Sequence, residues 1–77
     1  MGNLQNKQLD NHSACLLLGY DYKRNIKDTL GRVWKWCAWP MSGGSVVYFN
    51  DKEVMRLWIE QVNEKRWMEG DGISLLD

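Results

Sequence analysis

The sequence is poor in the residue types that build catalytic and metal sites. Its 77 residues include one histidine, His12, and two cysteines, Cys15 and Cys37, which lack the Cys-x-x-Cys spacing of zinc and redox sites. His12 lies in a polar segment with no nucleophile near it in the sequence. We therefore predict a non-catalytic protein without metal or cofactor. The two thiols are expected to be free and buried, and a disulfide between them stays open as an alternative.

Net charge and long apolar runs are also missing. Ten basic and ten acidic residues cancel, so no long-range field draws the whole molecule to nucleic acid or to an anionic membrane. No apolar stretch approaches the roughly 18 residues of a membrane-spanning helix. Leu16, Leu17 and Leu18 lie too deep in the chain, after Asp10, for the core of a signal sequence. We expect a cytosolic protein with no membrane partner, in which any nucleic-acid binding depends on a local patch.

Tryptophan, in contrast, is abundant. Trp34, Trp36 and Trp39 lie within six residues of one another, and Trp58 and Trp67 follow. A chain of this length buries only about 60% of the surface that it exposes when unfolded. We therefore expect some of this aromatic surface to remain exposed.

The first part of the chain is the harder to assign. Residues 1–13 are polar and are predicted to form a flexible arm, which leaves residues 14–77 as a single small domain. Residues 14–22 are largely apolar and suit a strand, although a short helix that ends at Gly19 is an alternative. Residues 23–31 have the composition of a loop.

The second part has clearer patterns. Tryptophan and valine over residues 32–39 predict a strand, and residues 45–49 predict a second one after a hairpin loop with two glycines. Asn50 is expected to cap a helix that starts at Asp51 and ends near Met68. The predicted fold is α+β, a three-stranded antiparallel β-meander packed on one C-terminal amphipathic helix. The apolar tail, residues 73–76, either adds to the sheet edge or serves a partner by strand addition.

The meander is expected to have two apolar faces when its loops centre near Ile26 and Ser42. One face carries Leu16, Leu18, Tyr20, Trp34, Trp36, Val46 and Tyr48. The other carries Cys15, Leu17, Val33, Cys37, Trp39, Val47 and Phe49, with Lys35 and Asp21 among them. One helix covers one face, and we expect it to cover the first. The second face is then exposed.

An exposed face rich in aromatic residues is typical of protein interfaces. We predict a small protein-binding module, an inhibitor or adaptor of the kind that phages and other mobile elements encode. Its partner is another protein or a second copy in a homodimer. The residues expected to make the contact are Lys35, Trp39, Val47 and Trp67.

A basic cluster favours nucleic acid as an alternative partner. Lys23, Arg24, Lys27, Arg32 and Lys35 lie close together in the sequence, next to Tyr20 and Tyr22. Such side chains contact phosphates and stack on bases.

Part of the chain also resembles a known DNA-binding family. Trp39-Pro40, the stretch Gly43–Phe49 and the stretch Asn50–Val54 with Trp58-Ile59-Glu60 are similar to the wing and following helix of excisionase-type and AlpA-type winged-helix proteins. The resemblance covers about residues 39–60. It implies a winged helix-turn-helix with a first helix over residues 14–19, a recognition helix that ends with residues 32–36, and a glycine hairpin as the wing.

Overall fold

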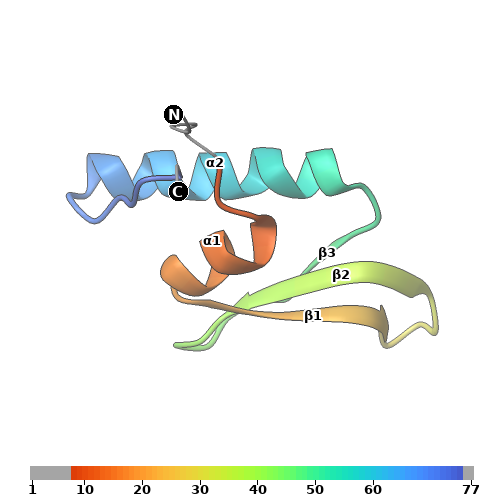
Figure 1. Cartoon of the computed structure of the whole chain (residues 1–77). Coiled ribbons are helices and arrows are strands. Elements are labelled where there is room, and N and C mark those ends of the chain that lie inside the picture. The colour runs from red at the N-terminus through yellow and green to blue at the C-terminus, as the bar shows by residue number, and fades with distance from the viewer. Residues whose placement is uncertain (1–7, 76–77) are drawn as a thin grey trace, which may run out of the picture.

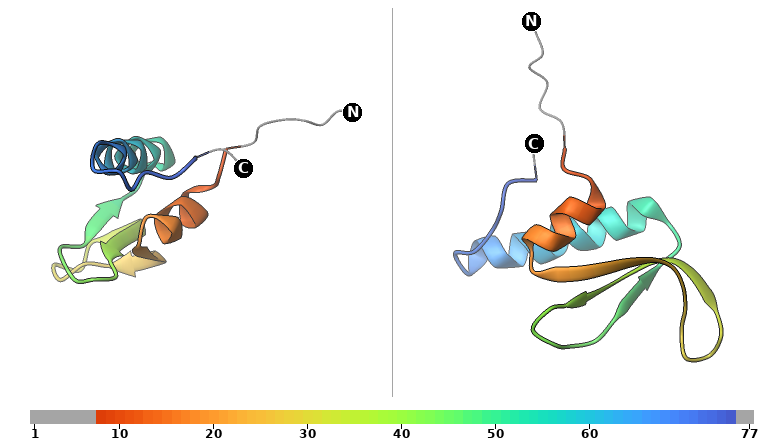
Figure 2. Two further views of the ribbon diagram at one scale, coloured as in Figure 1. Left: turned by 90° about the vertical axis from the view of Figure 1, so that its left-hand side faces the viewer. Right: turned by 60° about the horizontal axis from the view of Figure 1, so that its bottom comes forward.

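The computed structural model of the protein describes residues 8–75 and contains five elements in the order α-β-β-β-α. They are α1 (Asn11–Leu17), β1 (Tyr20–Lys27), β2 (Val33–Pro40), β3 (Val47–Phe49) and α2 (Lys52–Met68). The strands form an antiparallel sheet in the order β1-β2-β3. Both helices lie on the same face of this sheet (Figures 1 and 2). The predicted three-stranded meander with a C-terminal helix is thus confirmed, and α1 is an additional element.

Helix α1 corrects the predictions for the first part of the chain. Asp10 caps it by accepting a 2.7 Å hydrogen bond from the Ser13 amide, and Gly19 ends it with a φ of 82°. Residues 11–13 therefore belong to a helix, while residues 1–7 of the predicted arm lie outside the described residues. The strand predicted over residues 14–22 is wrong up to Leu17, where the helical alternative holds, and begins only at Tyr20.

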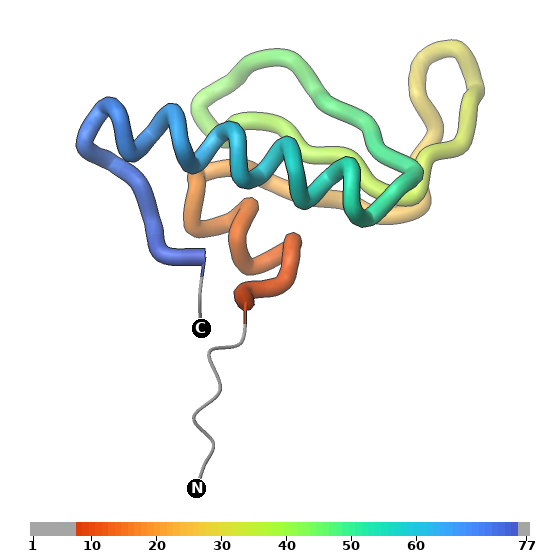
Figure 3. Tube along the Cα trace, turned by 90° about the horizontal axis from the view of Figure 1, so that it is seen from above, coloured from red at the N-terminus to blue at the C-terminus, as the bar shows by residue number. Residues whose placement is uncertain are grey.

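The loop predicted over residues 23–31 is also corrected. Strand β1 continues to Lys27 and pairs with β2 from Tyr20 opposite Pro40 to Lys27 opposite Val33, except at Asn25, which has a φ of 52°. Its charges suit a strand because most of its side chains are exposed. The turn is confined to residues 28–32, where Gly31 has a φ of 83°. In Figure 3 this hairpin projects well beyond the helices.

The register of β3 differs from the prediction by one residue. A turn centred on Ser42 would place Trp36 opposite Tyr48, but Trp36 lies opposite Phe49. Because side chains alternate between faces, a shift of one residue moves every side chain of a strand to the other face. Val47 and Phe49 therefore lie on the helix side with Trp36, and Tyr48 lies on the opposite side with Cys37. The predicted faces were wrong for β3.

The core lies between the helices and one face of the sheet. Its buried residues come from α1 and the residue after it, from β2 and β3, and from α2: Ala14, Cys15, Leu18, Ala38, Phe49, Met55 and Ile59. Tyr20 and Trp36 pack against this cluster, as predicted, but Cys15 does too, because it lies on α1 and not in the sheet. Two helices, and not one, cover the face.

Helix α2 begins one residue later than predicted. Its N-cap is Asp51, whose carboxylate accepts from the amides of Glu53 and Val54. The side chain of Asn50 accepts a 2.9 Å bond from the Lys35 amide and so extends the pairing between β2 and β3. The helix ends at Met68, as predicted, and Gly70 follows with a φ of 91°. None of the described helices is long and apolar enough to cross a membrane.

The tail packs beside α2 instead of at the sheet edge. The side-chain amide of Asn63 donates to the Ile73 carbonyl at 2.9 Å and accepts from the Ile73 amide at 2.8 Å. The Leu9 amide donates to the Leu75 carbonyl at 2.8 Å. The tail therefore joins the segment before α1 to the middle of α2, and residues 76–77 lie outside the described residues.

The recognition helix that the excisionase resemblance implies is not formed. The segment at residues 32–36 leads into and lies in β2. Its alternation of tryptophans matches the two-residue period of a strand. The helical part of the resemblance at residues 14–19 coincides in part with α1, and the glycine turn between β2 and β3 occupies the place of the wing.

Candidate functional site

The four residues predicted to bind protein do not share one surface. Lys35 is exposed on β2, and Trp39 is half-buried on the sheet face opposite the helices, beside Asp21. Val47 packs against the core on the helix side, so its assignment to the open face was wrong. Trp67 lies at the end of α2, 59% exposed, and its indole nitrogen donates to the Ile73 carbonyl. Only Lys35 and Trp39 share a strand, four residues apart on β2.

The basic residues, in contrast, come together on the β1–β2 hairpin. Lys23, Arg24 and Lys27 lie on β1, Lys35 lies on β2, and Arg32 lies in the turn. All five are exposed. They are half of the ten basic residues of the chain, whereas only two acidic residues, Asp21 and Asp28, fall between Tyr20 and Pro40. Residues 50–77 carry seven acidic and four basic residues. The zero net charge therefore conceals a positive hairpin and a negative C-terminal region.

Asp28 is the acid that organises the hairpin turn. One carboxylate oxygen accepts from the amides of Leu30 and Arg32. The other accepts from the Arg32 guanidinium at 2.8 Å and from the Trp34 indole at 2.9 Å. The hydrogen bond from Trp34, followed by those from Arg32 and Leu30, lowers the pKa of Asp28 from 3.8 to about 2. The Asp28 side chain is only 6% exposed, and its charge interacts with groups of the turn itself.

This geometry predicts how acid affects the hairpin. Because the pKa of Asp28 is lower in the folded than in the unfolded chain, the ionised carboxylate stabilises the fold above about pH 4 and loses this effect as the pH falls through about 2. We expect the stability difference between the wild type and Asp28→Asn to be largest above pH 4 and to shrink toward pH 2. Urea denaturation over that pH range measures it. A difference that is constant with pH would contradict the assigned role.

A furrow connects the base of this hairpin to the two helices. One stretch is lined by Arg24, Asn25, Lys35 and Trp36. The next shares Arg24 and Trp36 with it and adds Asp10, Asn11, His12, Tyr22 and Lys52. The last shares Asp10, Asn11 and Lys52 and adds Gln8, Leu9, Glu53 and Arg56. Because neighbouring stretches share lining residues, the three hollows adjoin one another on the surface, and we call them together the furrow.

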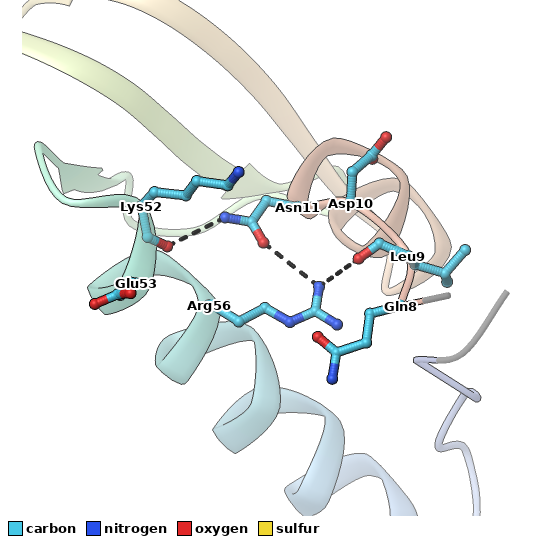
Figure 4. Close-up of a pocket in the computed structure, with 7 residues that line it drawn as sticks. All are labelled: Gln8, Leu9, Asp10, Asn11, Lys52, Glu53 and Arg56. Atoms are coloured by element: carbon cyan, nitrogen blue, oxygen red, sulfur yellow. Dashed lines mark hydrogen bonds between the residues drawn. The ribbon is translucent and has the colours of Figure 1, made fainter. Parts of the chain in front are cut away.

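Arg56 lines the end of the furrow that lies between the two helices. Its side chain is 16% exposed, and one terminal nitrogen donates to the Leu9 carbonyl at 2.6 Å and to the Asn11 side chain at 3.4 Å (Figure 4). Asn11 in turn donates to the Lys52 carbonyl at 3.3 Å. The Arg56 Nε lies 3.7 Å from the Glu60 carboxylate. One terminal nitrogen of this arginine therefore joins α2 to α1 and the segment before it, whereas Nε and the other terminal nitrogen are buried without a hydrogen-bond partner among the described residues.

The middle of the furrow combines cations with aromatic rings. The rings of His12 and Tyr22 stack with centroids 4.5 Å apart and planes at 15°. The Arg24 guanidinium donates to the Tyr22 hydroxyl at 3.3 Å. Trp36 is half-buried against the core and lines two stretches of the furrow. The furrow can thus offer charge to an anion and ring faces to a planar group.

The thiols have no such role. Cys15 and Cys37 are both buried and free, as predicted. Burial raises the pKa of Cys15 to about 11, and burial is also the main cause that raises the pKa of Cys37. Both thiols are therefore protonated at neutral pH and poor nucleophiles. In the part of the chain that the structure describes, no three His, Cys, Asp or Glu side chains lie close enough to hold a metal ion.

Sequence reasoning found the hairpin cations but missed the residues that face them from the helices. His12 and Lys52 belong to segments that are far from the hairpin in the sequence, and His12 was assigned to a flexible arm. The signal that could have revealed the helix that carries His12 is Asp10, followed three residues later by Ser13, because this pair indicates a cap before an apolar helix.

No family model, curated protein or solved structure matches the chain.

Proposed function

We propose that this protein binds nucleic acid through the basic β1–β2 hairpin and the furrow at its base. The observation that carries the proposal is the concentration of five exposed cations on one projecting hairpin. Of the two acids between Tyr20 and Pro40, Asp28 is bound to Arg32 within the turn, and Asp21 is the other. Phosphate contacts from such cations supply most of the affinity of non-specific nucleic-acid binding. A two-stranded β-ribbon also fits the grooves of a duplex.

The charge distribution supports this assignment in a second way. The acidic excess lies in residues 50–77. In Figure 3, α2 begins beside the base of the hairpin and runs to the other side of the molecule, while the hairpin turn projects beyond it. A polyanion is therefore attracted to the projecting hairpin more than to the rest of the molecule. This polarity orients the encounter even though the total charge is zero.

Removing hairpin cations tests the proposal. We expect wild-type protein to bind labelled oligonucleotides at low salt, and the double variant Lys27→Gln/Lys35→Gln to bind more weakly. Each lost phosphate contact lowers the slope of log affinity against log salt by about 0.7–0.9. Lys65→Gln removes an exposed cation from the last turn of α2 and should leave affinity and slope unchanged. Equal losses in both variants, or binding without salt dependence, would contradict a phosphate-binding hairpin.

Protein binding remains the second candidate, because no described helix or strand covers the face of the sheet opposite the helices. That face carries the half-buried Trp39 and Tyr48, and the Tyr48 ring lies 5.5 Å from that of Trp34. A role as an inhibitor or adaptor of the phage or mobile-element type would use this face, against another protein or a second copy. The variant Trp39→Ser discriminates: it should keep nucleic-acid binding, and it should lower any concentration-dependent sedimentation.

A further inference from the structure

The aromatic rings that line the furrow distinguish between single-stranded and duplex nucleic acid as its ligand. We propose that the furrow takes a single-stranded segment, with an unpaired base against its aromatic rings and the adjoining phosphates against its cations. This inference rests on the proposed function and deepens it. The rings are those of His12, Tyr22 and Trp36, and the cations are Arg24 and Lys35.

The rings are arranged as a platform before any ligand arrives. His12 and Tyr22 are nearly parallel, and the exposed His12 ring is the outer member of the pair. The Arg24 side chain is held beside them by its bond to the Tyr22 hydroxyl. A base that lies on this pair extends an existing stack, and little side-chain freedom is lost on binding. Bases of a duplex already stack on one another, so their faces are not accessible to such a platform without unpairing.

The position of Asp10 in the furrow indicates where the base and the phosphates of the nucleic acid lie. The Asp10 carboxylate lines the same stretch as His12 and caps α1 through the Ser13 amide, whose hydrogen bonds are the main cause that lowers the pKa of Asp10. It stays negative at neutral pH and repels a phosphate at that end. A neutral base is compatible with it. The base therefore lies toward His12, and the phosphates lie toward Arg24 and Lys35.

Three labelled probes test the inference by fluorescence anisotropy at one low salt concentration. They are oligo(dT) and oligo(rU) of about 12 nucleotides, within the range that one small single-strand-binding domain covers, and a random duplex of the same length. We expect either or both single strands to bind more tightly than the duplex. His12→Ala should weaken single-strand binding roughly 5-fold or more, since stacking on one ring is worth about 5- to 150-fold in affinity, and should change duplex binding by less than about twofold. Leu17→Ala, an exposed residue of the same helix outside the furrow, is the matched control.

Trp36→Phe supplies a second readout that does not depend on a loss of affinity. Phenylalanine keeps an aromatic ring against the core but removes the indole that lines the furrow. We expect oligo(dT) to quench the tryptophan fluorescence of the wild type and to quench that of Trp36→Phe much less. Equal quenching in both proteins would place the bases elsewhere and overturn the inference.

The outcomes separate this inference from the proposed function. Salt-dependent binding in which the duplex equals or exceeds both single strands, or in which His12→Ala changes nothing, would overturn the single-strand assignment and leave the basic hairpin as a phosphate-binding element. Failure of all three probes to bind at low salt would overturn both proposals.

Discussion

Replacing Ile59 with alanine is expected to lower the free energy of unfolding by about 2–5 kcal/mol. Ile59 is fully buried in the core formed by α1, α2 and the sheet, together with Met55 and Phe49. A domain of this size is stabilised by only about 4–12 kcal/mol, and each kcal/mol corresponds to about 4–8 °C in Tm. Ile59→Ala should therefore lower Tm by about 8–40 °C. Thermal and urea denaturation followed by circular dichroism measure the effect.

The control for this variant lies two residues away on the same helix. Leu57 is 58% exposed, so Leu57→Ala removes a similar apolar side chain from the solvent side of α2. We expect a change within about 0.5 kcal/mol, as is usual for exposed substitutions. Equal losses of stability in the two variants would contradict the structure, in which Ile59 faces the core and Leu57 faces solvent.

Asn63→Ala is expected to cost about 2–3 kcal/mol, because Asn63 is a buried polar residue with two hydrogen bonds to one backbone unit. The variant leaves the Ile73 amide without its acceptor, whereas the Ile73 carbonyl keeps the Trp67 indole as a donor at 3.2 Å. A buried group that loses its partner costs about 1–3 kcal/mol. Urea denaturation reports the total loss, and hydrogen exchange reports where it arises.

Hydrogen exchange tests this prediction at individual backbone amides. The Ile73 amide should exchange much faster in Asn63→Ala than in the wild type, and the Leu9 amide, which donates to Leu75, should follow as the tail detaches. Gln61→Ala removes an exposed amide from the same helix and should leave both amides protected. An Ile73 amide that stays protected in Asn63→Ala would show that other contacts hold the tail.

Local patterns were sufficient for the elements that carry strong periodicity. The alternating tryptophans of β2 and the amphipathic pattern of α2 are visible in the sequence because each element repeats its own geometric period. The short helix α1 was predicted only as an alternative to a strand, because its two turns contain too few residues for a period to be recognised. Its start was not predicted, because its cap, Asp10, lies in a segment whose polarity resembles that of a flexible arm.

The candidate site was predictable only in part, for a related reason. The cations of the hairpin are close together in the chain, so composition alone marks them. His12 and Lys52 reach the furrow from two different helices, and their proximity to Arg24 depends on how those helices pack on the sheet. A linear pattern contains no information about such distances.

The sequence by itself determined the fold class, the central strand, the long helix, and the excess of positive charge between Tyr20 and Pro40, since these follow from local period and composition. The tertiary structure decided which face of the sheet each side chain occupies, because the pairing of Trp36 with Phe49 and not with Tyr48 inverts the whole of β3. It also decided that a second helix covers the core and that rings and cations from four elements, α1, β1, β2 and α2, line one furrow. Both outcomes depend on packing between segments that are distant in the chain, where a shift of one residue changes which groups meet.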